Sequence, residues 1–143
     1  MNEKIIIYTD GGSRGNPGIA GSGAYLTYFD GRVIKEAYRP LGIKTNNFAE
    51  YEAVVLALET MKEVFGIEKL KNFEIEIKMD SELVQRQLIG RYRVKDKVLQ
   101  VQFSKLQTLM KDFNKIKFTH IPREENKDAD RLSNVAMDVG ERK

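Results

Sequence analysis

The N-terminal part of the chain alternates apolar runs with turn signals, which predicts three consecutive strands. Residues 4–10 hold an apolar-rich run that is typical of a buried strand. Residues 19–29 are rich in small and aromatic side chains, and Asp30-Gly31 is a strong hairpin signal before a return strand at 32–40. This part of the chain therefore predicts an antiparallel meander.

The rest of the chain alternates helical with strand periodicity. Apolar residues at helical spacing predict helices at residues 47–65, 82–89, 96–112 and from Asn126 to near the C-terminus. Apolar and charged side chains alternate over residues 73–80, and residues 116–119 form a short apolar run, so two more strands are expected. Ser81 and Asn126 are the expected N-caps of the second and last helices.

This order of elements predicts a mixed α/β fold in which a five-stranded sheet is flanked by helices. The meander supplies three strands. The strand at 73–80 should lie parallel to the first strand, because a helix connects it back to the sheet. Ligands of such sheets bind beyond the carboxyl ends of the parallel strands, and Asp10 and Asp80 lie at those ends.

Composition limits the classes of protein that fit. With 143 residues, 41% of them hydrophobic, the chain is expected to form one domain over residues 1–143. It has no cysteine, which excludes disulfides and thiolate metal sites and suits a reducing compartment. Its apolar runs are too short for a membrane span or a signal peptide, so we expect a cytoplasmic protein with no membrane partner. The net charge of +3 is only mildly basic.

Four acidic residues have positions that suggest a shared site. Asp10 and Asp80 end predicted strands. Glu50 begins the apolar stripe of the first helix, and Asp130 lies in the first turns of the last one. Taken singly, they could be turn, helix-dipole, capping or solvated residues. Together they favour convergence, because a buried carboxylate needs a compensating partner, and gathered carboxylates favour hard divalent cations.

The segments that carry these acids resemble the type 1 ribonuclease H family. They are YTDGGSRGNPG, TNNFAEYEAVVLAL, MDSELVQRQL and HIPREENKDADRLSN, and they follow the family's order over nearly the whole chain. The resemblance implies a ribonuclease H-like sheet and cleavage of the RNA strand of RNA–DNA hybrids to 5′-phosphate and 3′-hydroxyl ends. It also implies that two Mg²⁺ ions, for which Mn²⁺ substitutes, are bound by Asp10, Glu50, Asp80 and Asp130.

Residues around the acids are similar to those with which the family binds its substrate. The matching residues are Gly11, Gly12, Ser13, Asn16, Asn46, Asn47 and Ser81. The first four belong to a loop that meets the RNA strand, where glycines let backbone amides approach sugars and phosphates. The asparagine pair contacts the minor groove. The ordinary alternatives are a plain glycine turn and helix capping.

Two further candidates follow the last predicted strand. His120, the only histidine, lies ten residues before Asp130, where relatives place a histidine that assists proton transfer or product release. In relatives that histidine often lies in a glycine-containing loop, whereas residues 121–123 contain a proline and no glycine. Arg123 is therefore a second candidate, as a fixed cation near the scissile phosphate. A surface or packing position for His120 and a surface ion pair for Arg123 are the alternatives.

The chain also differs from many relatives in the segment that is expected to bind nucleic acid. They carry a basic, tryptophan-bearing helical protrusion, whereas this chain has no tryptophan and only a short connection there. Arg91, Arg93 and Lys95 could contact DNA phosphates from this connection, with Tyr92 as a stacking aromatic. The alternative is a solvated loop.

The leading hypothesis is a monomeric endoribonuclease that acts on RNA–DNA hybrids by a two-metal-ion mechanism. The alternatives are a nuclease that also cuts double-stranded RNA, a DNA-cutting relative and a non-catalytic hybrid-binding module. The presence of all four acids favours an enzyme. An initial Met1 and a short polar tail at residues 139–143 favour a standalone protein over a domain of a polymerase-type polyprotein.

Overall fold

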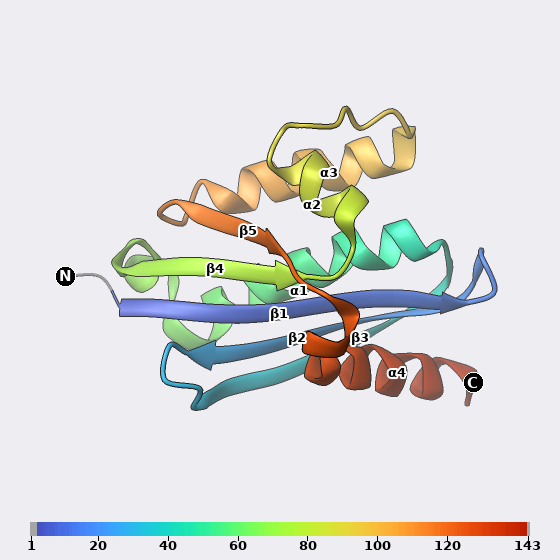
Figure 1. Cartoon of the computed structure of the whole chain (residues 1–143), viewed down its shortest axis with the longest axis horizontal. Coiled ribbons are helices and arrows are strands. Elements are labelled where there is room, and N and C mark those ends of the chain that lie inside the picture. The colour runs from blue at the N-terminus through green and yellow to red at the C-terminus, as the bar shows by residue number, and fades with distance from the viewer. Residues whose placement is uncertain (1–2, 143) are drawn as a thin grey trace.

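The computed structural model describes residues 3–142 and contains one five-stranded sheet (Figure 1). Its strands are β1 (Glu3–Arg14), β2 (Gly18–Tyr28), β3 (Val33–Lys44), β4 (Phe73–Met79) and β5 (Ile116–His120). They lie in the order β3-β2-β1-β4-β5, with the first three antiparallel and β4 and β5 added in parallel. The predicted fold class is confirmed. Met1 and Lys143, at the two ends of the chain, lie outside the described residues.

Two strands of the meander are longer than the sequence predicted. β1 continues past Asp10 to Arg14 and stays paired with β2, so the glycines that read as a turn belong to a strand. β3 continues through Pro40 to Lys44, with a register shift at Pro40. An edge strand tolerates proline because its missing N–H faces away from the sheet.

The helices cover both faces of the sheet. They are α1 (Asn46–Phe65), α2 (Glu82–Leu88), α3 (Lys97–Met110) and α4 (Lys127–Glu141), and two unpredicted 3₁₀ turns are η1 (Ile67–Asn72) and η2 (Arg123–Glu125). Neighbouring glycines of β1 face opposite helices, since a Cβ on Gly11 would meet Ala49 of α1 and one on Gly12 would face Met137 of α4. Helices α1 and α4 therefore lie on opposite faces. The expected polar tail mostly forms the last turn of α4.

The residues that cap the helices differ in part from those predicted from the sequence. The side chain of Thr45, not of either asparagine that follows it, caps α1 by accepting a hydrogen bond from Phe48 N at 3.1 Å. Ser81 caps α2 as predicted, accepting from Val84 N at 3.3 Å. Asn126 occupies the N-cap position of α4, but its side chain makes no capping bond, so that prediction is wrong.

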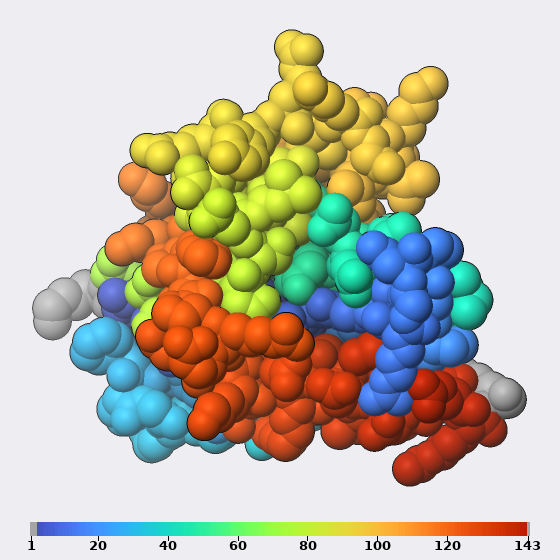
Figure 2. All heavy atoms as spheres, turned by 45° about the vertical axis from the view of Figure 1, so that its right-hand side comes forward, coloured from blue at the N-terminus to red at the C-terminus, as the bar shows by residue number. Residues whose placement is uncertain are grey.

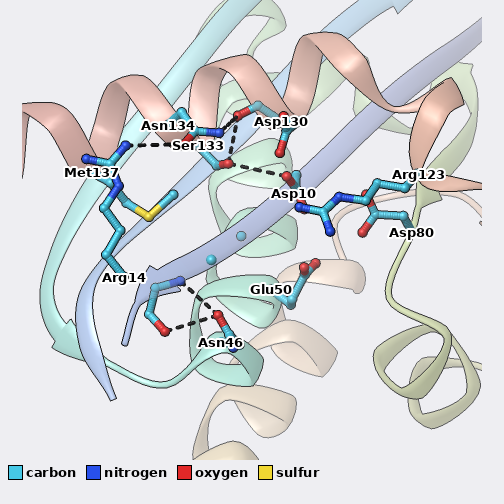
Figure 3. A pocket seen from close by; sticks show the side chains of 13 residues that line it. Asp10, Arg14, Asn46, Glu50, Asp80, Arg123, Asp130, Ser133, Asn134 and Met137 are labelled. Carbon is cyan, nitrogen blue, oxygen red and sulfur yellow. Dashed lines mark hydrogen bonds between the residues drawn. The ribbon is translucent and has the colours of Figure 1, made fainter. Parts of the chain in front are cut away.

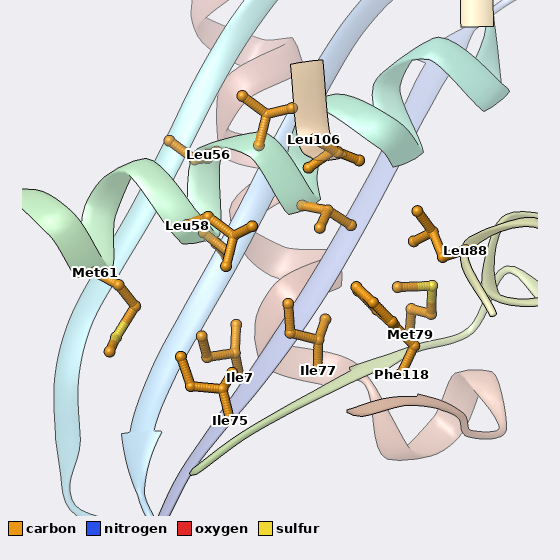
Figure 4. Close-up of a cluster of buried hydrophobic side chains, with 14 of the residues drawn as sticks. Ile7, Leu56, Leu58, Met61, Ile75, Ile77, Met79, Leu88, Leu106 and Phe118 are labelled. Atoms are coloured by element: carbon orange, nitrogen blue, oxygen red, sulfur yellow. The ribbon is translucent and has the colours of Figure 1, made fainter. Parts of the chain in front are cut away.

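Helix α1 is buried on nearly every side because it lies between the sheet and α3 (Figure 4). Its Leu58 and Met61 are fully buried, as are Ile7 of β1 and Leu106 of α3. Each such side chain contributes roughly 1.5–3 kcal/mol of burial free energy. This packing fixes the position of α1 on the sheet.

None of the helices between residues 3 and 142 combines the length and apolar character that a membrane crossing requires.

Candidate active site

The acidic residues meet where β4 ends and β1 continues without it. The parallel pairing of these strands stops at Thr9 and Met79. Asp10 is the next residue of β1, and Asp80 is the first residue after β4. Helix α1 crosses β1 at Gly11, where an added Cβ would lie only 2.2 Å from backbone atoms of Ala49. The absence of a side chain at Gly11 lets α1 approach, and this brings the next residue of the helix, Glu50, to the same point.

Three carboxylates form a tight cluster. Asp10, Glu50 and Asp80 each offer an oxygen, and these oxygens lie within 4.8 Å of one another. Asp10 and Glu50 are only 7% and 8% exposed. Asp130 lies on the first turn of α4 and lines the same cavity, outside this close triad (Figure 3). The structure therefore brings all four acids to one cavity and three of them to metal-binding spacing.

The cluster is electrostatically costly without a cation. Burial, reinforced by repulsion from Asp80 and Asp130, raises the pKa of Asp10 from 3.8 to about 7. Burial and repulsion from Asp10 and Asp80 raise the pKa of Glu50 well above its usual 4.5. A bound cation would remove both penalties, and an all-oxygen donor set suits a hard divalent ion. The residues present thus fit a metal site.

The acids open into a cavity of about 510 Å³ that four of the expected substrate contacts also line. These are Gly11, Gly12, Ser13 and Asn46. The Ser13 backbone N–H and hydroxyl both donate to Asn46 Oδ1, at 2.8 and 3.0 Å, and the backbone N–H of Asn46 donates to Asn16 Oδ1 at 3.0 Å. The end of β1 is thereby hydrogen-bonded to the start of α1.

Figure 2 shows the cavity as a hollow in the surface. Dark blue atoms of β1 lie deep in it, between red α4, the orange segment before α4 and the lime start of α2.

The structure separates the two candidates that follow β5. Arg123, in η2, lines the cavity, and Figure 3 shows its side chain extending on the side of Asp10 and Asp80. His120 is the last residue of β5 and is exposed, outside the set of cavity-lining residues. Of these two candidates, the arginine is therefore the one that shares the cavity with the acids.

Comparison with known proteins identifies the family. A family model described as reverse transcriptase-like matches residues 8–136. LC11-RNase H1, isolated from compost, is 46% identical in a superposition that covers 97% of this chain and 98% of that one, with a TM-score of 0.88. The chain belongs to the ribonuclease H family. The resemblance inferred from four sequence segments is confirmed.

Further relatives are similar over nearly all of this chain. LC11-RNase H1 has also been solved in complex with an RNA/DNA hybrid, at 45% identity, 94% and 97% coverage and a TM-score of 0.88. Ribonuclease HI of Halobacterium salinarum is 38% identical over 135 residues, 94% of this chain. The bifunctional protein Rv2228c of Mycobacterium tuberculosis is 40% identical over 137 residues, 95% of this chain. The chain spans 65% of the halobacterial relative and 36% of the mycobacterial one.

The chain has no helical protrusion between α2 and α3. No helix is found between Leu88, the end of α2, and Lys97, the start of α3. The basic residues of this connection line a second cavity of about 590 Å³, together with one of the asparagines at the start of α1. The expected contacts found there are Asn47, Arg91, Arg93 and Lys95. Ser81 lines neither cavity.

Sequence reasoning missed four residues that line the first cavity. Ser133, Asn134 and Met137 follow Asp130 at positions i+3, i+4 and i+7, so helical spacing from that acid could have found them. Ser133 Oγ lies 3.3 Å from Asp10 Oδ2. Arg14 had no such signal, because its place depends on the unpredicted extension of β1. It forms ion pairs with Asp138 and Glu141 of α4 at 2.8 and 2.9 Å.

Proposed function

We propose that this chain is an endoribonuclease that hydrolyses the RNA strand of RNA–DNA hybrids and leaves 5′-phosphate and 3′-hydroxyl ends. The observation that carries the proposal is the triad of Asp10, Glu50 and Asp80 within 4.8 Å, at the base of a cavity that the glycines of β1 also line. Membership of the ribonuclease H family and the hybrid-bound structure of a 45% identical relative support it. Residues 1–143 would act as a single catalytic domain and as a monomer.

The carboxylates would hold two Mg²⁺ ions, with Mn²⁺ as a substitute. Asp10, Glu50 and Asp80 would provide the closest ligands, and Asp130 would complete the site from α4. Two such cations, when bound, supply charge neutralisation for the phosphodiester and activation of the attacking water. The carboxylates themselves need to transfer no proton. Their task is to remain ionised, and the raised pKa of Asp10 makes that dependent on both pH and metal.

The glycine-containing end of β1 would position the RNA strand. Gly12 carries no side chain, so sugars and phosphates can approach its backbone closely, and Gly11 lines the same cavity although α1 fills the space beside its Cα. Asn46 accepts both bonds from Ser13 through Oδ1, which leaves its Nδ2 amide to donate outward. A 2′-hydroxyl is a donor and an acceptor that DNA lacks, so an amide fixed here suits recognition of RNA. Asn16, held to the backbone of Asn46, would keep this arrangement rigid.

Cations on two sides would hold the phosphates. Arg123 lines the acidic cavity. Its guanidinium is permanently charged and would stabilise the negative charge that develops at the scissile phosphate. We propose that it takes the assisting role that relatives give to a histidine, and that His120 contributes little. On the other side, Arg91, Arg93 and Lys95 would contact phosphates of the DNA strand in place of the missing protrusion.

A panel of matched duplexes tests the proposal. RNA–DNA, RNA–RNA and DNA–DNA duplexes of one sequence are incubated with the protein and Mg²⁺, and each strand is followed separately. The proposal predicts cleavage of the RNA strand of the hybrid. Cleavage of double-stranded RNA at a similar rate would identify a broader nuclease, cleavage of DNA would replace the assigned substrate, and tight hybrid binding without cleavage would identify a binding module.

A further inference from the structure

Asn126 lies at the junction of the three segments that carry Asp10, Asp80 and Asp130. Its side chain is almost fully buried, at 1% exposure. The Nδ2 amide donates to the backbone oxygen of Thr9 at 2.9 Å and to Asp80 Oδ2 at 3.2 Å. The backbone oxygen of Asn126 accepts from Asp130 N at 3.1 Å. One residue therefore contacts the ends of β1 and β4 and the start of α4, as Figure 1 shows for the segment that crosses β1 between β5 and α4.

These contacts differ from those of an ordinary helix cap. A capping side chain accepts a hydrogen bond from the first turn of its own helix, and Asn126 makes no such bond. Its amide instead donates to the Thr9 carbonyl oxygen of β1 and to the Asp80 carboxylate at the end of β4. Thr9 is the last β1 residue paired with β4, so its carbonyl oxygen is bound at the point where the pairing stops. The Asn126 amide therefore binds β1 where its pairing with β4 ends.

The Asp80 carboxylate depends on this amide for its orientation. Asp80 follows the last residue of β4, where the ladder no longer fixes the chain. Among the described residues 3–142, no other side chain donates a hydrogen bond to its carboxylate. We infer that Asn126 is a positioning residue that holds the Asp80 carboxylate at metal-binding distance from Asp10 and Glu50. The inference rests on the proposed metal-dependent function.

A matched residue separates positioning from stability. Gln102 of α3 is also buried, at 5% exposure, and its Nε2 amide also bridges a backbone oxygen and a carboxylate. It donates to Phe48 O at 3.1 Å and to Glu52 Oε1 at 3.4 Å. Glu52 is not part of the acidic cluster. Loss of either amide removes two hydrogen bonds made by a buried side chain, so both losses should destabilise the fold.

The test compares Asn126→Leu with Gln102→Met. Mg²⁺ binding is measured by calorimetry without nucleic acid, and stability by thermal unfolding in EDTA. We expect both variants to lose stability, while Mg²⁺ affinity falls roughly 10- to 100-fold in Asn126→Leu alone, as is typical when a group that orients a metal ligand is removed. Asn126→Ser, which keeps one shorter donor, should fold more readily and give an intermediate loss.

Two results would overturn the inference. Wild-type Mg²⁺ affinity in both folded Asn126 variants would leave the proposed function intact and reduce Asn126 to a stabilising residue. An equal loss of affinity in Gln102→Met would show that the effect is a general consequence of destabilisation. Absence of Mg²⁺ and Mn²⁺ binding by the wild-type protein would instead overturn the proposed function, and the inference with it.

Discussion

Replacing Asp10 by asparagine is expected to stabilise the metal-free protein at neutral and alkaline pH. Asparagine keeps the shape of the side chain and resembles the protonated acid, so it removes the charge that the folded state disfavours. Asp10 is only 7% exposed, and it lies beside two other carboxylates of the cluster. The variant should therefore lose the proposed activity and gain stability, an opposition that an ordinary core residue would not show.

The size of the gain follows from the raised pKa. Folding raises the pKa of Asp10 from 3.8 to about 7, so between these values the folded state binds a proton that the unfolded state releases. Stability therefore falls as pH rises through this window, by about 1.4 kcal/mol for each pH unit. The full penalty above pH 7 is about 4 kcal/mol, an upper figure because Glu50 shares the same repulsion. At pH 5 the penalty is smaller by roughly 3 kcal/mol.

Urea unfolding in EDTA at pH 5 and pH 8 measures this difference. Asp128→Asn provides the control, because Asp128 lies in the first turn of α4, two residues before Asp130, but is exposed and paired with Arg131 at 3.4 Å. We expect it to change stability by about 0.5 kcal/mol or less at either pH. The reasoning is refuted if Asp10→Asn is no more stable than the wild type at pH 8, or if its gain is the same at pH 5.

The remaining predictions concern the metal, the packing and the nucleic-acid contacts. Mg²⁺ at 100 times its dissociation constant should stabilise the wild type by about 2.7 kcal/mol and Asp10→Asn far less; equal melting shifts would argue against a site at the cluster. Gly11→Ala should destabilise the protein by about 3 kcal/mol, because the new Cβ would lie 2.2 Å from Ala49 backbone atoms, and an unchanged melting temperature would contradict the packing described. Arg123→Ala should reduce turnover of the hybrid at least tenfold while His120→Ala stays within threefold of the wild type, and the reverse order would return the role to the histidine. Neutralising Arg91, Arg93 and Lys95 together should reduce the magnitude of the slope of log affinity against log salt concentration by about 2–3. An unaltered slope would show that these residues do not contact the phosphates.

Local patterns were enough to predict the architecture because apolar spacing reports which face of an element is buried. The alternation at residues 73–80 and the helical stripe at 47–65 each correspond to an observed element, with ends shifted by a few residues. The errors have a common cause. Gly11 and Gly12 lie beyond the predicted end of the first strand, and residues 42–44 lie beyond that of the third, yet pairing with β2 holds them in strands. Pairing partners lie far along the chain, so a local pattern does not reveal them.

The site was predictable to the extent that its residues end or begin regular elements. Asp10 and Asp80 could be placed together because parallel strands share their carboxyl ends. The difference between Asp130 and the close triad depends on how α4 docks, and sequence spacing does not contain that distance. The inward turn of Asn126 was missed for a related reason. Its position is that of a helix cap, and only the folded sheet supplies the acceptors that its amide binds instead.

The most direct test of the central claim uses a hybrid whose RNA and DNA strands carry different labels at both ends. It is incubated with the wild-type protein in Mg²⁺, with the same protein in EDTA, and with Asp10→Asn in Mg²⁺. We predict that only the RNA strand is cut, to fragments with 5′-phosphate ends, and only by the wild type with Mg²⁺. Cleavage that persists in EDTA or in Asp10→Asn, or no cleavage with either Mg²⁺ or Mn²⁺, would contradict the claim that the gathered carboxylates form a metal-dependent ribonuclease site.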